Sequence, residues 1–379
     1  MSFTRVSDVG EFGLIDRLHR IVAPTEKKLP SLKKGIGDDC AVIALPNAKA
    51  QVVSTDLLLE QIHFDLLTTP MEHLGAKAIS VNVSDVCAMN ALPLYATISV
   101  ALSEKISVEM MESLYKGARS AAEKYGIAIV GGDTSASTAG LVISVTVVGE
   151  ADAEKLSYRN GAKVGDLICL TGDVGRSFAG LKILMRERQL MVEFYRDNPD
   201  AKAVDFEPDI EGYEKVVEKH LLPSARLDIV RYFAEKNIVP TSMIDISDGV
   251  GSELKHLCKQ SDVGALIEEN KLPILSEARE VADEFEDDAL TYALFGGEDY
   301  ELLFTINPKD LDELTANFDI AIIGEVKPKD FGVKLRDMYG HEEDLSQYSG
   351  FQHFKKPDDD HNHQHDHDHD DHEPLNSDD

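Results

Sequence analysis

Apolar and polar residues follow two different periods along the first 150 residues of the chain. Apolar side chains recur at helical spacing in the segments Ile15–Val22, Leu74–Met89 and Val108–Lys124. Runs typical of strands lie between or after them, at Gln51–Ser54, Tyr95–Ala101, Ala128–Val130 and Leu141–Val148. Because helical and strand segments alternate, this half is predicted to be an α/β unit.

The pattern changes in the 150s, where acidic and basic residues crowd together, and then resumes. We therefore predict a boundary there, with an N-terminal domain at 1–150 and a C-terminal α/β domain at 151–354. The second unit is predicted to hold these segments: a strand at 165–170, a loop at 172–177, a helix at Phe178–Arg186, an acidic surface excursion at 189–216, a strand–loop–helix at Met243–Cys258 and a strand at Tyr300–Thr305.

The segment 355–379 has a different composition from the rest of the chain. Between Pro357 and Asp379 only Leu375 is a sizeable apolar side chain, and histidines alternate with acids. Such a segment cannot bury enough apolar surface to offset chain entropy, so it is predicted to be a disordered tail. Its histidines are predicted to bind transition metals weakly, because the tail offers no fixed geometry.

Charge and cysteine content narrow the function classes. The 379 residues carry 38 basic and 69 acidic side chains, a net charge of −31, which repels nucleic acid and anionic membranes. No apolar run approaches the roughly 20 residues of a membrane span, and no apolar secretion segment opens the chain. The four cysteines are scattered in apolar surroundings, so reduced thiols and a cytoplasmic location are expected.

Six short acidic clusters carry the candidate chemistry. Most follow a β-branched run or open a small-residue loop: Asp38-Asp39, Thr55-Asp56, Asp85, Gly131-Gly132-Asp133, Asp245–Asp248 and Gly296–Asp299. An α/β fold gathers ligand-binding groups at the carboxyl ends of its strands, so these clusters are predicted to converge. Carboxylates that share a pocket need cations, and oxygen ligands of this kind suit Mg²⁺ bound with substrate phosphates. The sequence thus predicts a Mg-nucleotide enzyme.

Asp85 has the clearest surroundings of the six. Between Ala76 and Leu94 the only other charged residue is Lys77, and an unpaired buried carboxylate costs several kcal/mol or becomes protonated. A salt bridge to Lys77 or a capping role is the structural alternative. Metal coordination is favoured, because Lys77 is eight residues away and Asp85 lies within the helical run.

The other clusters allow a structural explanation beside the functional one. The two glycines before Asp38-Asp39 permit close approach to a phosphate or metal, or form a surface turn. Ser54-Thr55-Asp56 offers two hydroxyls and a carboxylate as metal ligands, or a helix cap. Gly131-Gly132-Asp133 is predicted to be a turn after a strand, with weak specificity for nucleotide. In Asp245–Asp248, alternation puts Asp245 and Ser247 on one face, while Asp248 falls at the turn into a helix.

The common phosphate-binding and nucleophile motifs do not occur. The sequence has no G-x-x-x-x-G-K-[ST], no G-x-S-x-G, and no glycine-rich loop or D-F-G of a protein kinase. Transfer between phosphates depends on charge neutralisation and alignment more than on a covalent nucleophile. We therefore assign no catalytic nucleophile.

In this order the motifs resemble those of the thiamine-monophosphate kinase family, within the superfamily of aminoimidazole-ribonucleotide synthetase-like ATP-binding enzymes. The matching segments run from about residue 10 to 354: Gly10–Phe12, Gly35–Cys40, Ser54–Asp56, His63-Phe64, Ala78–Ala88, Gly131–Asp133, Gly161–Gly172, Asp245–Gly249, Gly296–Leu302 and Gly350–Phe354. His63-Phe64, Gly296–Leu302 and Phe351–Phe354 are the segments that look specific to this family.

The resemblance implies ATP-dependent phosphorylation of thiamine monophosphate to thiamine diphosphate, by direct in-line transfer. By matching positions, it implies that several Mg²⁺ ions are held by Asp39, Ser54, Thr55, Asp56, Asp85, Asp133, Asp245 and Asp248. It implies ATP contacts for Tyr115, Gly132, Asp133, Arg159 and Ser247. It implies thiamine monophosphate contacts for His63, Glu298 and Phe351, although Phe351 departs from the tryptophan or tyrosine of this position.

The fold that the resemblance implies is a two-domain α/β fold with mixed sheets, whose N-terminal sheet pairs with a second subunit in a homodimer. One alternative is another chemistry of the superfamily: a formylglycinamidine ligase, selenophosphate synthesis or hydrogenase maturation. The last two favour a reactive residue in an N-terminal glycine loop or a C-terminal cysteine, whereas this chain ends in Ser377-Asp378-Asp379. A second alternative is a metal-binding scaffold that uses the tail.

Overall fold

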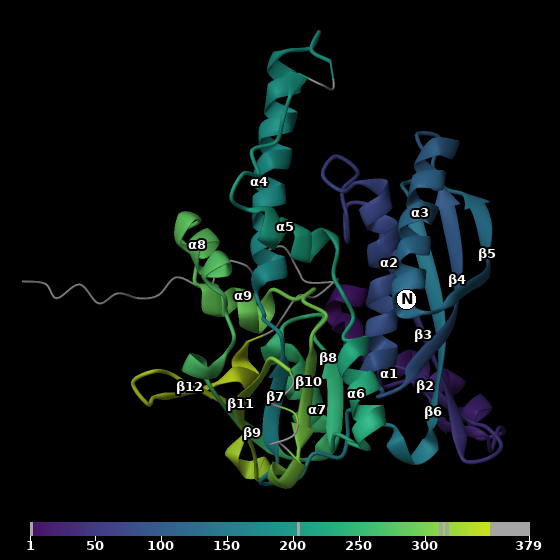
Figure 1. The fold of residues 1–379 in the computed structure, drawn as a ribbon, viewed down its shortest axis with the longest axis vertical. Coiled ribbons are helices and arrows are strands. Elements are labelled where there is room, and N and C mark those ends of the chain that lie inside the picture. Colours follow the sequence, from purple (N-terminus) through teal and green to yellow (C-terminus); the bar gives the residue numbers. More distant parts are fainter. Residues whose placement is uncertain (1–2, 203–204, 311–313, 315–317, 349–379) are drawn as a thin grey trace, which may run out of the picture. The chain divides into compact units, whose positions relative to one another are not determined.

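The computed structural model describes the chain except for residues 1–2, 203–204, 311–313, 315–317 and 349–379 (Figure 1). Residues 25–351 form one compact unit, and residues 1–24 belong to a separate one. The latter contains most of helix α1 (Gly10–Glu26). Phe351 and the predicted tail at 355–379 lie outside the described residues.

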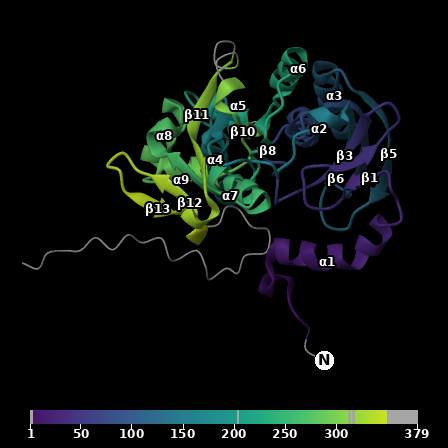
Figure 2. The same ribbon diagram turned by 90° about the horizontal axis from the view of Figure 1, so that it is seen from below.

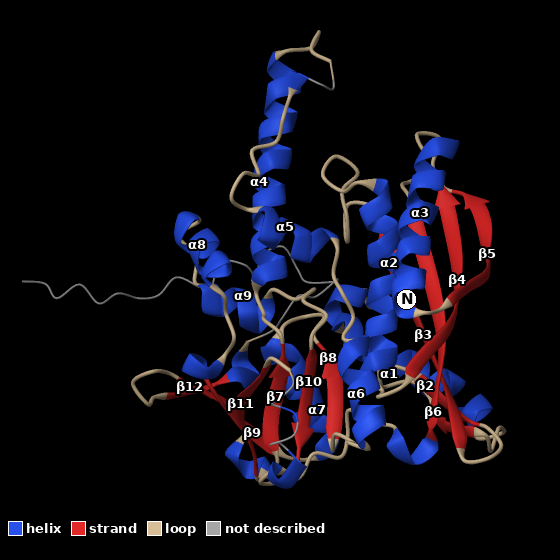
Figure 3. Cartoon of the chain, viewed as in Figure 1, coloured by secondary structure: helices blue, strands red, loops and turns tan. Residues whose placement is uncertain are grey.

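The compact unit contains two mixed sheets, each made from a different half of the chain (Figure 3). The first has the order β1-β2-β3-β6-β4-β5: β1 (Leu32–Lys34), β2 (Ala41–Ala44), β3 (Lys49–Leu59), β4 (Leu92–Leu102), β5 (Ala128–Ala136) and β6 (Val142–Asp152). Its pairs are antiparallel except β4–β5. The regular alternation of buried and less buried residues along β6 explains why this sequence forms a strand with one covered face.

The second sheet has the order β13-β12-β9-β11-β7-β10-β8. Its strands are β7 (Leu167–Thr171), β8 (Ser242–Asp245), β9 (Gly264–Glu268), β10 (Leu302–Ile306), β11 (Ile320–Lys327), β12 (Val333–Arg336) and β13 (Glu342–Asp344). β9 and β12 are parallel, and the other pairs are antiparallel. Strands β7 and β10, inside this sheet, and the edge strand β8 are buried along almost their whole length, as continuous apolar runs predict.

Helices cover these sheets and join them. They are α2 (Met71–Ala88), α3 (Val108–Tyr125), α4 (Arg176–Asp197), α5 (Glu214–Leu221), α6 (Leu227–Lys236), α7 (Val250–Ser261), α8 (Ser276–Glu284) and α9 (Ala289–Phe295). α2 and α3 lie side by side on the first sheet, and α6 lies beside α2 (Figure 2). No described helix is long and apolar enough to cross a membrane.

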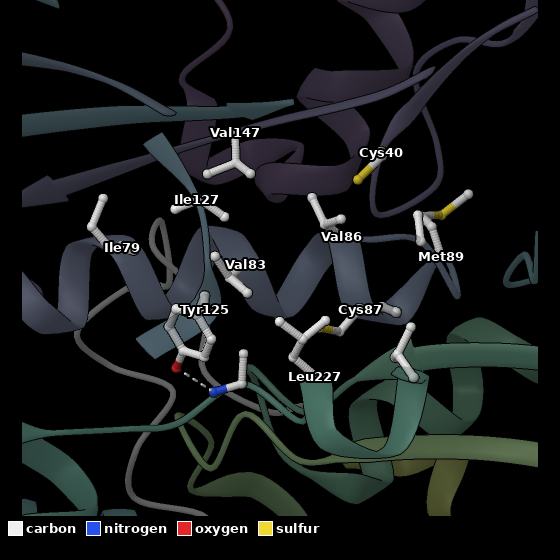
Figure 4. Packing of buried hydrophobic residues seen from close by; sticks show 14 of the residues in the cluster. Cys40, Ile79, Val83, Val86, Cys87, Met89, Tyr125, Ile127, Val147 and Leu227 are labelled. Atoms are coloured by element: carbon white, nitrogen blue, oxygen red, sulfur yellow. Dashed lines mark hydrogen bonds between the residues drawn. The ribbon is translucent and has the colours of Figure 1, made fainter. Parts of the chain in front are cut away.

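α2 is the element on which the site depends, because it is buried on nearly all sides. Val83, Val86 and Cys87 pack between Val147 of β6 and Leu227 of α6 (Figure 4). The core cluster that contains them continues to Met243 and Leu302 of the second sheet. Small residues permit this close packing: a Cβ atom at Gly75 would lie 1.8 Å from the carbonyl oxygen of Leu114 in α3. α2 therefore presents its few polar side chains to both halves of the chain.

Two local predictions differ from the structure. The Gly131-Gly132 turn is wrong, because β5 continues through both glycines to Ala136, paired in parallel with β4. The surface excursion at 189–216 is wrong at both ends, because α4 continues to Asp197 and α5 begins at Glu214. In both cases pairing or helix propagation continues through residues that are themselves weak signals for a strand or a helix.

Candidate active site

Three carboxylates from three separate elements meet beside α2. Asp39 lies in the loop between β1 and β2, Asp85 is in the last turn of α2, and Asp245 ends β8. One carboxylate oxygen of each residue lies within 4.8 Å of the others. We call these three residues the acidic cage. Their convergence follows from topology, since α2 contacts both β3 of the first sheet and β8 of the second.

Polar side chains orient the cage carboxylates. Ser54 Oγ of β3 donates a hydrogen bond to Asp85 Oδ2, and Ser84 Oγ of α2 donates one to Asp245 Oδ2 over 2.6 Å. Asn82, one turn before Asp85, accepts a hydrogen bond from the backbone N–H of Asp56 over 3.0 Å. Lys77 does not pair with Asp85 in the structure, so the salt bridge considered from the sequence is not formed.

Arg159 is the cation that the described structure brings to the cage. Its Nε and Nη2 lie 3.1 and 2.5 Å from Asp39 Oδ1, and its backbone N–H donates to Asp38 Oδ1 over 3.1 Å. Asp39 Oδ2 is buried, and no described residue forms a hydrogen bond with it. A buried carboxylate oxygen without a donor is suited to bind a cation.

The cage carries more negative charge than its surroundings compensate. Burial, and next the charges of Asp56, Asp245 and Asp39, raise the pKa of Asp85 well above its ordinary value, although Ser54 opposes the shift. Burial and then the charge of Asp39 raise the pKa of Asp245 to about 7 and that of Asp56 to about 6. The pKa of Asp39 is also raised by burial, with Arg159 working against it. Buried carboxylate oxygens whose negative charge the protein does not compensate suit a hard divalent cation such as Mg²⁺.

Alternation along β3 divides the predicted metal ligands between two faces of the first sheet. Ser54 and the backbone of Asp56 contact α2, whereas the Thr55 hydroxyl donates to the carbonyl oxygen of Val145 over 3.0 Å and accepts from Thr146 over 3.1 Å. Thr55 is exposed on the face away from α2, which we call the open face. Asp133 on the edge strand β5 is also exposed, and it pairs with Ser99 of β4. Neither belongs to the acidic cage.

Of the residues predicted to contact ATP, Arg159 lies at the cage, and the others lie on separate elements. Tyr115 is exposed on α3, and Gly132 is in β5 with Asp133. Ser247 and Asp248 lie in the loop between β8 and α7. Glu253, which the sequence pattern did not indicate, also belongs here: its carboxylate accepts hydrogen bonds from Ser247 Oγ over 3.3 Å and from the Asp248 N–H over 2.9 Å. Its position five residues after Asp248, in the first turn of a helix, is the signal that could have indicated it.

A second cluster lies around Glu298. Lys77 Nζ of α2 is 3.1 Å from both Glu298 carboxylate oxygens, and His220 Nδ1 is 3.3 Å from one of them. Burial alone would raise the pKa of Glu298, but Lys77, His220 and His63 together lower it. His63 Nδ1 accepts the N–H of Leu59 over 3.0 Å, so a neutral His63 carries its proton on Nε2. The two substrate residues implied by the resemblance and described by the structure, His63 and Glu298, are thus close together.

Two acids that follow Glu298 have structural partners that the sequence analysis did not foresee. Asp299 accepts hydrogen bonds from the N–H groups of Gly175 and Ser177, over 2.7 and 3.1 Å, at the start of α4. Glu301 is buried and accepts from Thr171, Lys219 and Arg226 over 2.6 to 2.8 Å. Only tertiary contacts reveal these roles, because no partner is a neighbour in sequence.

The two halves of the chain match the models of one domain family. Residues 37–151 match "AIR synthase related protein, N-terminal domain", and residues 163–336 match the corresponding C-terminal domain. Together with the two mixed sheets, this confirms the predicted two-domain, aminoimidazole-ribonucleotide synthetase-like α/β fold.

The whole chain is similar to thiamine-monophosphate kinases. It is 38% identical to that of Aquifex aeolicus (strain VF5) over 81% of this chain and 88% of the relative, and 33% identical to that of Buchnera aphidicola subsp. Schizaphis graminum (strain Sg) over 92% and 99%. A solved structure described as "AaThiL complexed with AMPPCP and TMP" covers 93% of this chain and all of its own, with 33% identity and a TM-score of 0.76. The chain belongs to the thiamine-monophosphate kinase family, which confirms the resemblance noted in the sequence.

Proposed function

We propose that this protein transfers the terminal phosphoryl group of ATP to the phosphate of thiamine monophosphate, forming thiamine diphosphate and ADP. Family membership supports this reaction, as does the similar structure described with AMPPCP and TMP. The observation in this chain that carries the proposal is the acidic cage, in which three carboxylates from both halves of the fold meet within 4.8 Å. Such a group suits metal-assisted transfer from a nucleoside triphosphate to a phosphate monoester.

We propose Asp39, Asp85 and Asp245 as the core Mg²⁺ ligands, with Ser54 and Asp56 beside them. When bound, Mg²⁺ would neutralise the charge of the phosphates and align them. Asp248, on the loop after β8, is proposed to extend the set. The chain itself orients the cage: Ser54 and Ser84 fix two carboxylates, and Arg159 holds the third.

For the substrates we keep the assignments implied by the family. Arg159 and Ser247 are proposed to contact ATP, and the planar guanidinium of Arg159 has further N–H groups for a phosphate. Glu298 and His63 are proposed to bind thiamine monophosphate. The lowered pKa of Glu298 keeps its side chain ionised, so that a carboxylate would face the cationic ring of the substrate. The contact of Phe351 with thiamine monophosphate stays a prediction, because Phe351 lies outside the described residues.

We propose that the protein is a homodimer joined through the first sheet. The support is an exposed edge strand and an open face with apolar side chains, including Leu57, Tyr95 and Val130, which are 49, 50 and 60% exposed. Unpaired edges and apolar sheet faces favour association with another chain. Gly132 and Asp133 for ATP, and Thr55 and Asp133 for metal, would then act near or at this interface, and Tyr115 is proposed to contact ATP from α3.

A cytoplasmic location remains part of the proposal. The cysteines Cys40, Cys87, Cys169 and Cys258 are free and buried, which agrees with a reducing compartment.

The test is an assay of the purified chain with ATP, Mg²⁺ and thiamine monophosphate, in which thiamine diphosphate and ADP are quantified together. Equal amounts of both products are expected, abolished by EDTA and by Asp85→Asn. Asp330→Asn, which changes an exposed acid far from the cage in sequence, is the matched control and should be fully active.

The same assay decides between this reaction and the alternatives. ADP without thiamine diphosphate would contradict the acceptor and indicate another chemistry of the superfamily. Turnover of free thiamine faster than thiamine monophosphate would also contradict it. A chain that is inactive but binds metal through residues 357–379 would support the scaffold function.

A further inference from the structure

Two nitrogen atoms from different helices contact the carboxylate of Glu298, the residue proposed to face the cationic ring of the acceptor. Lys77 Nζ of α2 lies 3.1 Å from both carboxylate oxygens, and His220 Nδ1 of α5 lies 3.3 Å from Oε2. The Glu298 side chain is nevertheless 24% exposed. Buried groups thus hold the carboxylate from the protein interior, while part of the side chain stays accessible to a ligand.

His220 lies in the last turn of α5, on the face that this helix buries. It shares that face with Val216, Val217 and Leu221, and it is 6% exposed. Its Nδ1 also forms a hydrogen bond of 3.3 Å with Ser177 Oγ, in the first turn of α4. A histidine on an apolar helix face can be purely structural. Here, however, one ring nitrogen contacts a residue proposed to bind substrate.

The start of α4 is a fixed support for the His220 ring. Asp299, the neighbour of Glu298, accepts hydrogen bonds from the N–H groups of Gly175 and Ser177 over 2.7 and 3.1 Å. Ser177 itself is fully buried. His220 completes a closed set of contacts, because it joins Ser177 back to Glu298. Such a set limits the movement of the Glu298 carboxylate.

His220 is neutral at physiological pH. Burial, and next the charge of Lys77, lower its pKa to about 4, although Glu298 opposes the shift. The pKa of Glu298 is lowered too, so this group stays ionised. At neutral pH the charges in this group of three are therefore those of Lys77 and Glu298, which compensate each other.

The proton of the neutral His220 ring belongs on Nδ1. A bare nitrogen would place its lone pair 3.3 Å from a carboxylate oxygen, which cannot donate, whereas an N–H is attracted to that oxygen. The same N–H can also donate to Ser177 Oγ. His220 thus stabilises the carboxylate without adding a charge.

We propose that His220 is a positioning residue for the acceptor: its neutral ring holds the Glu298 carboxylate in the orientation that receives the cationic ring of thiamine monophosphate. This inference rests on the proposed function. A second cation beside Glu298 would leave an excess positive charge and repel the ring of the substrate. A neutral N–H donor orients the carboxylate without this repulsion. His220 acts through Glu298 and takes no part in the transfer of the phosphoryl group.

The experiment compares wild type, His220→Leu and His220→Asn in the thiamine diphosphate assay. Leucine removes the ring N–H, while the side-chain amide of asparagine can return an N–H close to the Nδ1 position. His220→Leu is expected to raise KM for thiamine monophosphate about 10-fold, the worth of a hydrogen bond to a charged group, with kcat and KM for ATP within about twofold of wild type. His220→Asn should restore KM for thiamine monophosphate to within about threefold of wild type.

An uncharged acceptor separates positioning from a structural role. The probe is an analogue of thiamine monophosphate in which carbon replaces the charged ring nitrogen, and its binding is measured by calorimetry with AMPPCP present. His220→Leu should weaken binding of thiamine monophosphate about 10-fold and of the uncharged analogue by less than about twofold. Equal losses for the two acceptors would overturn the inference, as would a loss in KM for ATP that accompanies a fall in the thermal midpoint.

His341→Leu is the matched control. His341 Nδ1 also contacts a carboxylate, Asp337 Oδ2 over 2.9 Å, but in the exposed turn between β12 and β13. The kinetics of this variant should equal those of wild type. His220 variants that match wild type, in an enzyme that makes thiamine diphosphate, would overturn the inference alone. If wild type neither binds nor phosphorylates thiamine monophosphate, the proposed function fails first, and the inference fails with it.

Discussion

Lys77 and Glu298 are 221 residues apart in sequence, yet Lys77 Nζ lies 3.1 Å from each oxygen of the Glu298 carboxylate. The lysine side chain is only 2% exposed, and the glutamate is 24% exposed. The pair joins α2, which packs on the first sheet, to the segment that leads into β10 of the second. Each charge compensates the other. Without this pairing, neither half of the chain could bury its charged side chain.

Lys77→Met should destabilise the protein and alter acceptor binding. Removing one partner leaves Glu298 with an uncompensated charge, at a cost of about 3 kcal/mol in the free energy of unfolding. Urea unfolding at neutral pH measures this loss. Lys329→Met is the control, because its partner Asp262 is as exposed as the lysine, and it should change stability by less than about 0.5 kcal/mol.

The same pair predicts a pH dependence. The pKa of Glu298 is lowered in the fold, so the pair stabilises the protein above the unfolded pKa of 4.5, and this stabilisation is lost as pH falls through the lower folded value. In Lys77→Met the pKa of Glu298 should rise, moving the loss of thiamine monophosphate affinity to higher pH. KM measured across acidic pH tests this, and an unchanged profile would contradict it.

Without metal, the acidic cage should make the protein less stable as pH rises. Asp56 and Asp245 have folded pKa values of about 6 and about 7 against 3.8 unfolded, so the native state holds protons that the unfolded chain has released. Their stabilisation is complete below the unfolded pKa and lost as pH rises through 6 and 7. Thermal unfolding in EDTA over this range should show a falling midpoint, and Mg²⁺ should restore it most at the higher pH.

Asp85→Asn should separate stability from activity. Removing one buried negative charge should raise the metal-free stability at pH 8 by about 1–3 kcal/mol while turnover is lost. Stabilisation by Mg²⁺ should shrink in the same variant. Calorimetry with and without Mg²⁺ measures both, and a metal-free variant less stable than wild type would show that Asp85 is a structural group.

Asp299→Ala should unfold the start of α4 rather than affect the chemistry directly. The variant loses two hydrogen bonds to the Gly175 and Ser177 N–H groups, worth about 2–4 kcal/mol together. Asp288→Ala, which removes an exposed cap of α9, should cost about 1 kcal/mol. Equal losses in the two variants, measured by denaturant unfolding, would argue against the buried cap.

Gly132→Ala should destabilise the β4–β5 pairing. A Cβ at Gly132 would lie 1.7 Å from the carbonyl oxygen of Ile98, whereas at Gly131 the nearest atom is 3.9 Å away. Gly132→Ala is expected to cost about 3 kcal/mol or more, and Gly131→Ala less than about 0.5 kcal/mol. If Gly132→Ala instead raised KM for ATP with unfolding unchanged, the glycine would serve the nucleotide alone.

Much of the site was predictable because its signals are local. Asp85 is an acid inside a small, apolar helix, and such a group needs compensation wherever the helix lies. Asp39 and Asp245 were predicted because strands or glycine turns lead into them. The predicted helices and strands are present, apart from the continuation of β5 through Gly131-Gly132 and of α4 to Asp197, whereas α6, α8, α9, β9 and β11 were not predicted.

The faces and the partners were not predictable from local signals. Thr55 was grouped with Ser54 and Asp56, but side chains alternate along β3, so its hydroxyl is on the open face. The pairing of Lys77 with Glu298 depends on the packing of α2 against the second half of the chain. The same is true of the cap that Asp299 gives to α4.

The sequence by itself determined the element types, the acidic clusters and the family, since these depend on residue order and short-range periodicity. The tertiary structure alone decided which carboxylates share the cage, which face each hydroxyl occupies and which charges cancel. Those outcomes depend on distances of a few ångströms between residues far apart in sequence. Because buried charges interact strongly, such distances determine the pKa of each group.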